Sequence, residues 1–201
     1  MIDVRRLQAR LVAKGYPLTV DGAIGPKTLA ALFRAMGAGS DADAFGIGAA
    51  LCFGDAGILG TPLRLAHFMA QAAHESLGFR AMTEIWGPTP AQRGYEGRSD
   101  LGNTQPGDGF RYRGRGLFQI TGRANYAAAG KDLGLPLVDQ PETAAHPNIA
   151  VRTAVWYWSS RNLNTRADND DVIGITRRIN GGLNGLDDRR ARLSVAKGLI
   201  L

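Results

Sequence analysis

Cysteine is nearly absent from this chain of 201 residues, since Cys52 is the only one. A single cysteine cannot form an intramolecular disulfide, and it excludes a zinc module built from several cysteines. The sequence therefore predicts synthesis in a reducing cytoplasm, where disulfides do not persist.

Long apolar runs are absent as well. No stretch approaches the roughly 18 consecutive apolar residues that a membrane-spanning helix needs. Residues 1–6 (MIDVRR) contain an acidic residue and no apolar core, so they lack the pattern of a cleavable signal peptide. We therefore expect neither a membrane span nor a secretory leader in this sequence.

Acidic residues are outnumbered by basic ones, 18 to 24, which gives a formal net charge of +6. The excess is concentrated in residues 1–36, which contain six basic residues and two acidic ones. A basic balance favours a polyanionic partner such as nucleic acid, an anionic membrane surface or a carboxylate-bearing cell wall. Charge alone does not choose among these three.

Residues 1–36 have the features of a small helical unit. Apolar residues recur at helical spacing in residues 4–11 after Asp3, which is a suitable N-cap, and Pro26 opens a second helix. A domain below about 40 residues is marginal on its own, so we expect this unit to pack on the rest of the chain. Residues 37–44 are small and polar, which predicts a short linker.

The rest of the chain alternates apolar helical stretches with glycine-rich loops. We predict helices that begin at Pro62, at Ile149 and near Asp170, and a long loop over residues 85–116. No alternating strand pattern of any length is present. With 44% hydrophobic residues, the composition excludes a disordered chain and supplies a sizeable core. The predicted fold class is predominantly α.

The N-terminal unit carries an ordered set of motifs. These are LQ at residues 7–8, GY at residues 15–16 and VDGAIGPKT at residues 20–28. Together they resemble the peptidoglycan-binding domain of bacterial and phage wall hydrolases. The alternative is a helical hairpin that only packs on the larger domain.

Two glutamates near the end of one predicted helix are candidates for catalysis. Glu75 lies where that helix ends, and Glu84 follows nine residues later in a stretch of more solvated composition. The negative end of a helix and apolar neighbours both favour the protonated form of a carboxyl group, as a general acid requires. One protonated and one ionised carboxyl group is the arrangement for glycoside hydrolysis. The alternative is a pair of solvated or salt-bridged glutamates without a catalytic role.

A metal site is the rival interpretation of the same helix end. His74 and Glu75 begin like a zinc-protease motif, but position 78, where the second histidine would stand, is glycine. His67 and His74 lie on one helix face, and only His146 remains as a third histidine. We therefore predict structural histidines and no metal ion.

A second informative segment is YRGRGLFQIT at residues 112–121. Its arginines and aromatics could bind nucleic acid, but the segment passes into a polar row formed by Gln119, Thr121 and Asn125. Alternation places Gln119 and Thr121 on one side of an extended segment, where they would line a sugar-binding cleft. A third segment, Asn180 with two glycines after it, offers an amide at a helix end, or only a plain C-cap.

These segments together resemble glycoside hydrolase family 19, the chitinase and phage-endolysin family of lysozyme-like helical enzymes. The shared motifs are HES at residues 74–76, the following Glu84, the segment 112–121 with NY at residues 125–126, and INGG at residues 179–182. The resemblance implies a lysozyme-like catalytic domain preceded by the small helical wall-binding module. The domain limits that we predict are residues 1–36 for the module, 37–44 for the linker and 45–201 for the catalytic domain.

The resemblance also implies a role for each matching residue. Glu75 would be the general acid, Glu84 the base that activates water, and Thr121 a residue that helps to hold that water. The predicted sugar-binding residues are Tyr112, Gln119, Asn125 and Asn180. An arginine within residues 187–190 would match a family arginine near the acid, although the motif alone does not show which one.

The short spacing between the two glutamates and the lack of disulfides differ from plant chitinases and favour peptidoglycan over chitin. The resemblance thus implies a phage-type endolysin that cleaves the wall glycan with inversion, without a cofactor. Alternatives are a chitinase of the same fold and a non-catalytic wall-binding virion protein. We expect a monomer that binds peptidoglycan, can contact an anionic outer membrane or wall polymers, and does not bind nucleic acid. It would be made in the host cytoplasm and act on the wall from the periplasm or from outside.

Overall fold

Helices make up nearly all of the regular structure. The computed structural model describes residues 1–201 and has no β-sheet, only isolated antiparallel bridges from Arg115 to Thr83 and to Ile120. The helices are α1 (Val4–Ala13), α2 (Pro26–Ala35), α3 (Ala42–Cys52), α4 (Pro62–Glu75), α5 (Pro90–Arg93), α6 (Asp108–Arg111), α7 (Arg123–Leu133), α8 (Pro147–Ser160), α9 (Leu163–Asp168), α10 (Val172–Asn180) and α11 (Leu186–Ile200). Three short 3-10 helices are η1 (Ile58–Gly60), η2 (Ser99–Leu101) and η3 (Pro141–Ala145). The predicted predominantly α class is confirmed.

Local capping explains why the predicted helices begin where they do. The Asp3 carboxylate accepts a hydrogen bond from the backbone N–H of Arg6 at 3.0 Å, and the Thr61 hydroxyl accepts one from that of Arg64 at 3.2 Å. Proline stands at the start of α2, α4 and α8, where its missing N–H leaves no helical bond unmade. The helices predicted to begin at Pro26 and Pro62 are confirmed, as are those predicted near residues 149 and 170.

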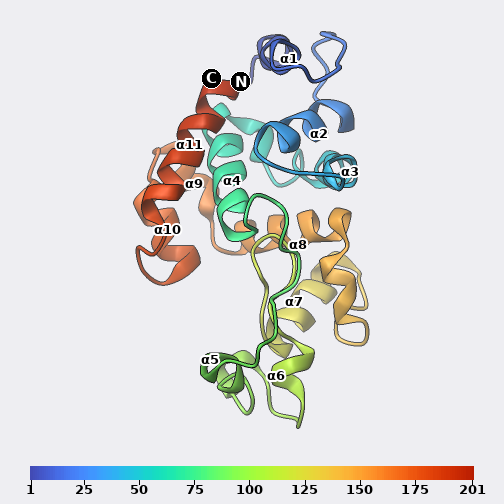
Figure 1. The fold of residues 1–201 in the computed structure, drawn as a ribbon, viewed down its shortest axis with the longest axis vertical. Coiled ribbons are helices and arrows are strands. Elements are labelled where there is room, and N and C mark those ends of the chain that lie inside the picture. The colour runs from blue at the N-terminus through green and yellow to red at the C-terminus, as the bar shows by residue number, and fades with distance from the viewer.

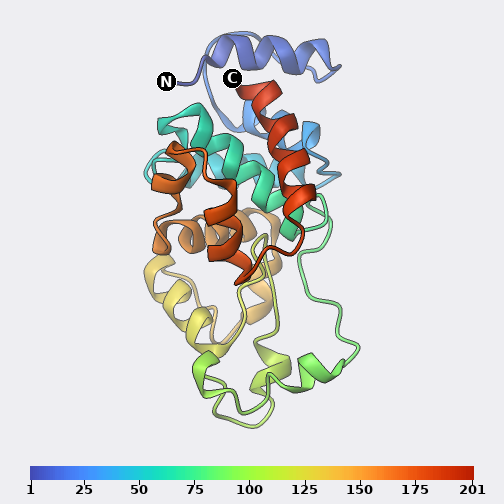
Figure 2. The same cartoon turned by 90° about the vertical axis from the view of Figure 1, so that its left-hand side faces the viewer.

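The molecule has two lobes (Figures 1 and 2). The lower lobe, residues 85–146, contains α5, α6 and α7 and has a small hydrophobic cluster of its own, built around Tyr112 and Tyr126. The upper lobe contains α1–α4 and α9–α11 around a larger cluster, which Leu117 and Phe118 of the loop before α7 also enter. Helix α8 contributes residues to both clusters. No helix is long and apolar enough to cross a bilayer.

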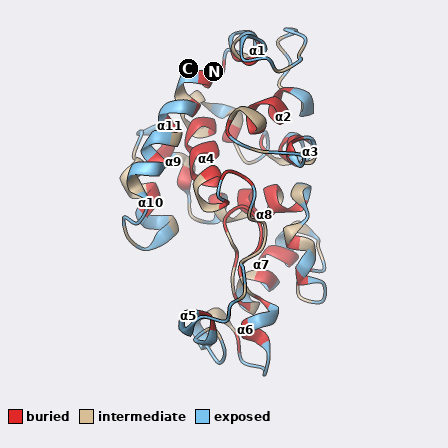
Figure 3. Ribbon diagram, in the orientation of Figure 1, coloured by how far each residue is buried: buried red, intermediate tan, exposed pale blue.

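Helix α4 is the centre of the upper lobe. Nine of its fourteen residues are buried, and Figure 3 shows it covered along most of its length. Helix α11 packs along it, and the last turn of α11 meets α1, where Arg10 donates to the carbonyl oxygen of Leu199 at 3.2 Å. Glu75 therefore lies at the exposed C-terminal end of a helix whose preceding residues are buried.

Residues 1–36 share the larger core with the rest of the chain. The Phe33 ring of α2 lies 5.3 Å from the ring of Phe45 on α3 and 5.1 Å from that of Phe79, between ring centroids. Leu7, Leu11 and Leu29 belong to the same buried cluster. The N-terminal unit thus packs on the body of the protein, as its small size predicted.

The segment 37–44 is not a linker over its whole length, because α3 begins at Ala42 within it. Its small residues, and those that follow, serve helix packing. A Cβ on Gly46 would lie 2.4 Å from the carbonyl oxygen of Pro26, and one on Gly48 would lie 2.6 Å from that of Asn148. Helix α3 therefore fits closely between α2 and α8 only because glycine stands at both contacts. The predicted long loop at residues 85–116 likewise contains η2 and the short helices α5 and α6.

Phe33→Ala tests whether residues 1–36 and the body unfold together. The substitution leaves a cavity in the shared core, and we expect the free energy of unfolding to fall by about 3–5 kcal/mol. Urea unfolding followed by tryptophan fluorescence measures this loss, because all three tryptophans lie outside residues 1–36. Val12→Ala, on the exposed side of α1, is the control and should change little. An unchanged tryptophan transition in Phe33→Ala would contradict a shared core.

Candidate active site

Glu75 is the last residue of α4, and its carboxylate forms an ion pair with Arg189. The Nη2 atom of Arg189 donates to Glu75 Oε1, whereas Oε2 accepts no hydrogen bond within the protein. The Glu75 side chain is 21% exposed, so it opens to the surface. The apolar setting that the helix end predicted is wrong, since the carboxylate faces a buried positive charge.

Arg189 lies in the first turn of α11 and is fully buried. Its Nη1 donates to the Gln71 side chain one turn before Glu75 on α4. A buried guanidinium is tolerated only with such partners, because desolvation of an unpaired charge costs several kcal/mol, on the order of the whole stability of a domain. The arginine that the motif left undetermined is therefore Arg189, whereas Arg190 is half exposed and points to Asp187.

Glu84 lies in the stretch that leads from α4 into the lower lobe, and neutral groups hold it. Its Oε1 accepts hydrogen bonds from Gln92 Nε2 at 2.9 Å and from the Tyr95 hydroxyl at 3.4 Å. Its Oε2 accepts one from the backbone N–H of Gly114 at 3.1 Å. Burial and the negative charge of Glu84 raise the pKa of Tyr95, which keeps that hydroxyl protonated as a donor. The carboxylate thus keeps a fixed orientation without a cationic partner.

Gln119 lies next to Glu84 across Gly114. A Cβ at position 114 would meet Gln119 Oε1 at 2.8 Å and Glu84 Oε2 at 3.3 Å, so glycine is needed for both side chains to approach. The extended alternation predicted for this segment is wrong. Gln119 has a φ of +48° in a tight turn closed by the bridge between Arg115 and Ile120.

Thr121 and Asn125 continue from Gln119 in a chain of hydrogen bonds. The Thr121 hydroxyl donates to the carbonyl oxygen of Gln119 at 2.9 Å, and Asn125 Nδ2 donates to that of Thr121 at 2.8 Å. The structure therefore places Gln119 beside Glu84, and local hydrogen bonds to backbone carbonyl oxygens link Thr121 and Asn125 to Gln119.

Tyr112 and Asn180 lie apart from this group. Tyr112 is only 1% exposed, packs on Tyr126 and donates from its hydroxyl to the carbonyl oxygen of Val138 at 3.0 Å. The prediction that Tyr112 binds sugar is wrong. Its ring is buried and its hydroxyl already has a hydrogen-bond partner, so Tyr112 belongs to the core. Asn180 is exposed at the end of α10, where Gly181 adopts the left-handed conformation of a C-cap.

Tyr157 links the end of α10 to the neighbourhood of Glu75. Its hydroxyl donates to the carbonyl oxygen of Ile179 at 3.1 Å. Burial raises the pKa of Tyr157, and the Glu75 carboxylate acts in the same direction. The sequence alone does not single out Tyr157, because nothing in an apolar helix pattern distinguishes it from the core.

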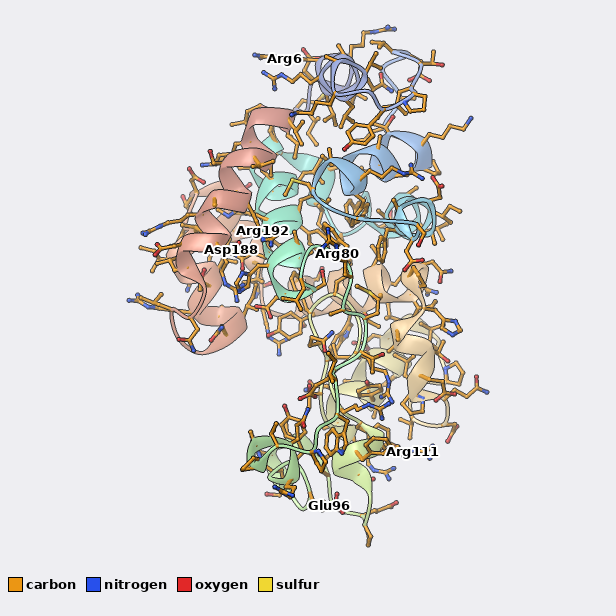
Figure 4. The ribbon with its side chains drawn as sticks, in the orientation of Figure 1. Arg6, Arg80, Glu96, Arg111, Asp188 and Arg192 are labelled. Carbon is orange, nitrogen blue, oxygen red and sulfur yellow. The ribbon has the colours of Figure 1, made fainter.

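His74, the residue before Glu75, contacts a carboxylate of α11. Its Nδ1 lies 2.6 Å from Asp188 Oδ2, which also accepts a hydrogen bond from Arg192 Nε at 2.6 Å. Although burial acts in the opposite direction, these hydrogen bonds from Arg192 and His74 lower the pKa of Asp188. Figure 4 shows Asp188 and Arg192 where α11 faces α4. The ring also fixes the turn before α11, since a Cβ on Gly185 would lie 2.3 Å from it.

The remaining histidine of α4 has a carboxylate partner too. His67 Nε2 lies 2.7 Å from Asp170 Oδ1, and its buried Nδ1 has no hydrogen-bond partner. Burial lowers the pKa of His67 although Asp170 opposes this effect, so the ring is neutral near pH 7. The structure contains no group of three or more His, Cys, Asp or Glu side chains that could hold a metal ion.

The two glutamates therefore stand in unlike settings at the two ends of one chain segment. Glu75 contacts a buried cation and opens to the surface through Oε2, whereas Glu84 is held by neutral donors. Two carboxyl groups whose environments differ can take the separate roles of proton donor and proton acceptor.

The chain is similar to a known family of glycoside hydrolases over most of its length. The sequence profile of the family described as Chitinase class I matches residues 40–178. A glycosyl hydrolase family 19 domain-containing protein of Haemophilus influenzae is 39% identical over 154 residues, which cover 63% of this chain and 75% of that protein. An endochitinase of Arabidopsis thaliana is 42% identical over 120 residues. Those residues are 59% of this chain and only 39% of the plant protein, so the chain spans about two fifths of that relative.

Solved structures share the fold at lower identity. A class IV chitinase from Zea mays superposes with a TM-score of 0.64 at 23% identity, covering 88% of this chain and 90% of that one. Chitinase C from Streptomyces griseus gives a TM-score of 0.60 at 22% identity, covering 98% of this chain and 76% of that one. The lysozyme-like helical arrangement of these enzymes is thus the arrangement found here.

The unlike partners of the two glutamates predict unlike effects on stability. In Glu75→Gln the buried Arg189 loses its counter-charge, and we expect the free energy of unfolding to fall by about 2–3 kcal/mol. Glu84→Gln loses at most one hydrogen bond to a neutral donor, which costs about 1 kcal/mol. Urea unfolding at pH 7 compares the two variants directly. Equal losses would show that the Arg189 pair contributes no more than an ordinary hydrogen bond.

Proposed function

The chain belongs to glycoside hydrolase family 19, the class I chitinase family. We propose that its substrate is the glycan strand of bacterial peptidoglycan. The proposal is a phage-type endolysin that acts on the host wall as a monomer and without a cofactor. It would be made in the host cytoplasm and reach the wall from the periplasm or from outside. The observation that carries catalysis is the pair of glutamates in unlike settings.

The proposed reaction uses each glutamate once. Glu84 accepts a proton from a water molecule that attacks the anomeric carbon, while Glu75 donates a proton to the oxygen of the departing sugar. Because Arg189 contacts only Oε1 of Glu75, Oε2 is free to carry that proton. Water attacks opposite the leaving group, so the anomeric configuration inverts. In this proposal Thr121 helps to hold the water, and Gln119, Asn125 and Asn180 bind the sugars.

Three features of the chain favour peptidoglycan as the substrate. The motifs of residues 1–36 resemble a peptidoglycan-binding domain, the two glutamates are only nine residues apart, and no disulfide can form. The basic charge of residues 1–36 also suits an anionic wall, because opposite charges concentrate the enzyme at its substrate. A wall-binding segment would raise the local concentration of glycan without a role in the chemistry.

A chitinase is the second candidate, and the names of the relatives favour it. The Arabidopsis protein is an endochitinase, and both solved structures described above are chitinases. Chitin and peptidoglycan glycans share N-acetylated sugars, so the same two carboxyl groups could act on either polymer. The difference lies in the lactyl and peptide groups that only peptidoglycan carries.

The substrate is tested by parallel digestion of purified sacculi and colloidal chitin. We expect soluble fragments with new reducing ends from sacculi, identified by mass spectrometry, and little product from chitin. Glu84→Gln is the control for enzyme-dependent release. Release from chitin alone would make the protein a chitinase, and no release from either polymer would contradict a glycosidase.

Glycosyl fluorides separate the two proposed catalytic roles. On natural glycan, both Glu75→Gln and Glu84→Gln should lose activity by about 10²–10⁴-fold, since positioned proton transfer contributes that much. Fluoride leaves without protonation, so on a matched glycosyl fluoride Glu75→Gln should retain substantial activity and Glu84→Gln should not. Fluoride release with an ion-selective electrode measures both rates.

Glu96→Gln is the matched control for this experiment. The Glu96 carboxylate lies at the tip of the lower lobe, where it accepts hydrogen bonds from the backbone N–H groups of Gly107 and Gly109 at 2.6 and 2.9 Å (Figure 4). This variant should keep its activity on both substrates. If it is inactive while Glu84→Gln is active, Glu96 and not Glu84 is the base.

A further inference from the structure

Four arginines of the lower lobe have no carboxylate partner, and three of them, Arg111, Arg113 and Arg115, are neighbours in the sequence. The ion pairs of the protein within 4.0 Å include neither Arg111 nor Arg113 nor Arg115. Most other buried or half-buried charges of this chain are paired, as Arg189 is with Glu75 and Arg123 with Asp108. Three neighbouring cations without counter-ions therefore need an explanation.

Neutral groups hold these side chains in place. Arg115 is only 4% exposed, and its Nη1 donates to the carbonyl oxygen of Arg111 and to the hydroxyl of Tyr126, both at 2.9 Å. Arg113 Nη1 donates to the carbonyl oxygen of Phe110 at 3.0 Å, and its buried Nε has no partner. Burial and the charge of Arg115 lower the pKa of Arg113. The protein thus orients the guanidinium groups without neutralising them.

All three arginines line one open cavity of about 680 Å³, which we name the arginine cavity. It lies between α6 and residues 138–142, and Arg123 with its partner Asp108 completes its cationic side. Two exposed carboxylates, Asp139 and Glu142, line it as well, but neither lies within 4.0 Å of an arginine. Arg115 is buried, Arg113 is half-buried and Arg111 is exposed, so the guanidinium groups range from the wall of the cavity to its rim. Guanidinium groups held around an open cavity can bind carboxylate or phosphate oxygens through paired N–H donors.

We propose that the arginine cavity binds an oxyanion, a carboxylate or phosphate group, carried by a bacterial wall polymer. The identity of the polymer rests on the proposed function, whereas the binding of an oxyanion does not. Peptidoglycan carries carboxylates on its peptide stems, and other wall polymers carry phosphates. Chitin carries neither group, so the cavity would discriminate between the two candidate substrates.

The cavity is close to Glu84 along the chain, but Glu84 is not among the residues that line it. Gly114, between Arg113 and Arg115, donates its backbone N–H to Glu84. Arg111 lies on the side of the lower lobe away from Asp188 and Arg192 (Figure 4). The cavity therefore holds a neighbouring part of the wall mesh, and this second contact raises affinity without a role in bond cleavage.

Direct binding of inorganic phosphate tests the cavity without any glycan. Phosphate is titrated at constant ionic strength while the side-chain N–H signals of the arginines are followed by NMR. We expect a saturable shift in the wild type and at least fivefold weaker binding in Arg113→Gln and in Arg111→Gln. Arg93→Gln is the matched control, an exposed arginine of the same lobe whose side chain has no partner, and it should bind as the wild type does. No saturable shift, or equal weakening in the control, would overturn the proposal.

Co-sedimentation with sacculi then identifies the source of the oxyanion. We expect Arg113→Gln to raise the half-saturating concentration of sacculi about fivefold, with Arg93→Gln unchanged. If hydrofluoric acid treatment of the sacculi, which removes phosphate polymers, abolishes this difference, the oxyanion is a phosphate. If the difference persists, it is a carboxylate of the peptide stems.

Two further outcomes separate the cavity from the proposed function. Equal binding of Arg113→Gln and the wild type to both kinds of sacculi would overturn the assignment to a wall polymer. If the wild type cleaves no sacculi, the proposed function fails, and the phosphate titration still decides whether the cavity binds an oxyanion. Circular dichroism of each variant confirms that it is folded.

Discussion

The buried guanidinium of Arg189 is the interaction on which the site depends. A fully buried cation holds α11 against α4 only because Glu75 and Gln71 supply its partners. The same contact fixes the carboxylate at the end of α4 and leaves its second oxygen free at the surface. One ion pair thus joins the packing of two helices to the placement of a proposed catalytic group. Fold and chemistry cannot vary independently at this position, because removal of Glu75 leaves the buried charge of Arg189 without its counter-ion.

Local signals in the sequence were enough to predict the helices that begin with a capping residue or a proline. They failed where packing decides the structure. Residues 37–44 have the composition of a linker, yet α3 begins at Ala42 within them. Glycine at positions 46 and 48 of the same helix allows α3 to approach α2 and α8 closely. Helix α11 was missed for a related reason. Its sequence is rich in charged residues, and nothing local shows that Arg189 alone among them is buried.

The residues of the candidate site also fall into those that local sequence signals predict and those that only long-range packing brings into place. Glu75 and Glu84 could be named from the sequence, since a helix end and a following loop are local features. Their partners could not, because Arg189 is 114 residues from Glu75 along the chain. Gln92 is an exception that a local signal could have revealed. Thr89 and Gln92 form a capping box, which places the Gln92 amide at the start of α5 and within reach of Glu84. Tyr112 shows the opposite failure, in which a motif position turned out to be core.

The close fit of α3 between α2 and α8 has a mechanical consequence. Flexible linkers let a binding module and an enzyme domain search independently, and the distance between them varies with each encounter. Here the N-terminal segment packs on the body through the shared core and the close glycine contacts of α3. If that segment anchors the molecule on a polymer surface, the two glutamates stand at one fixed height and angle above the anchor. The distance from the anchoring point to the bond that is cleaved is then constant, and the spacing of strands in the polymer decides which bonds the glutamates can contact.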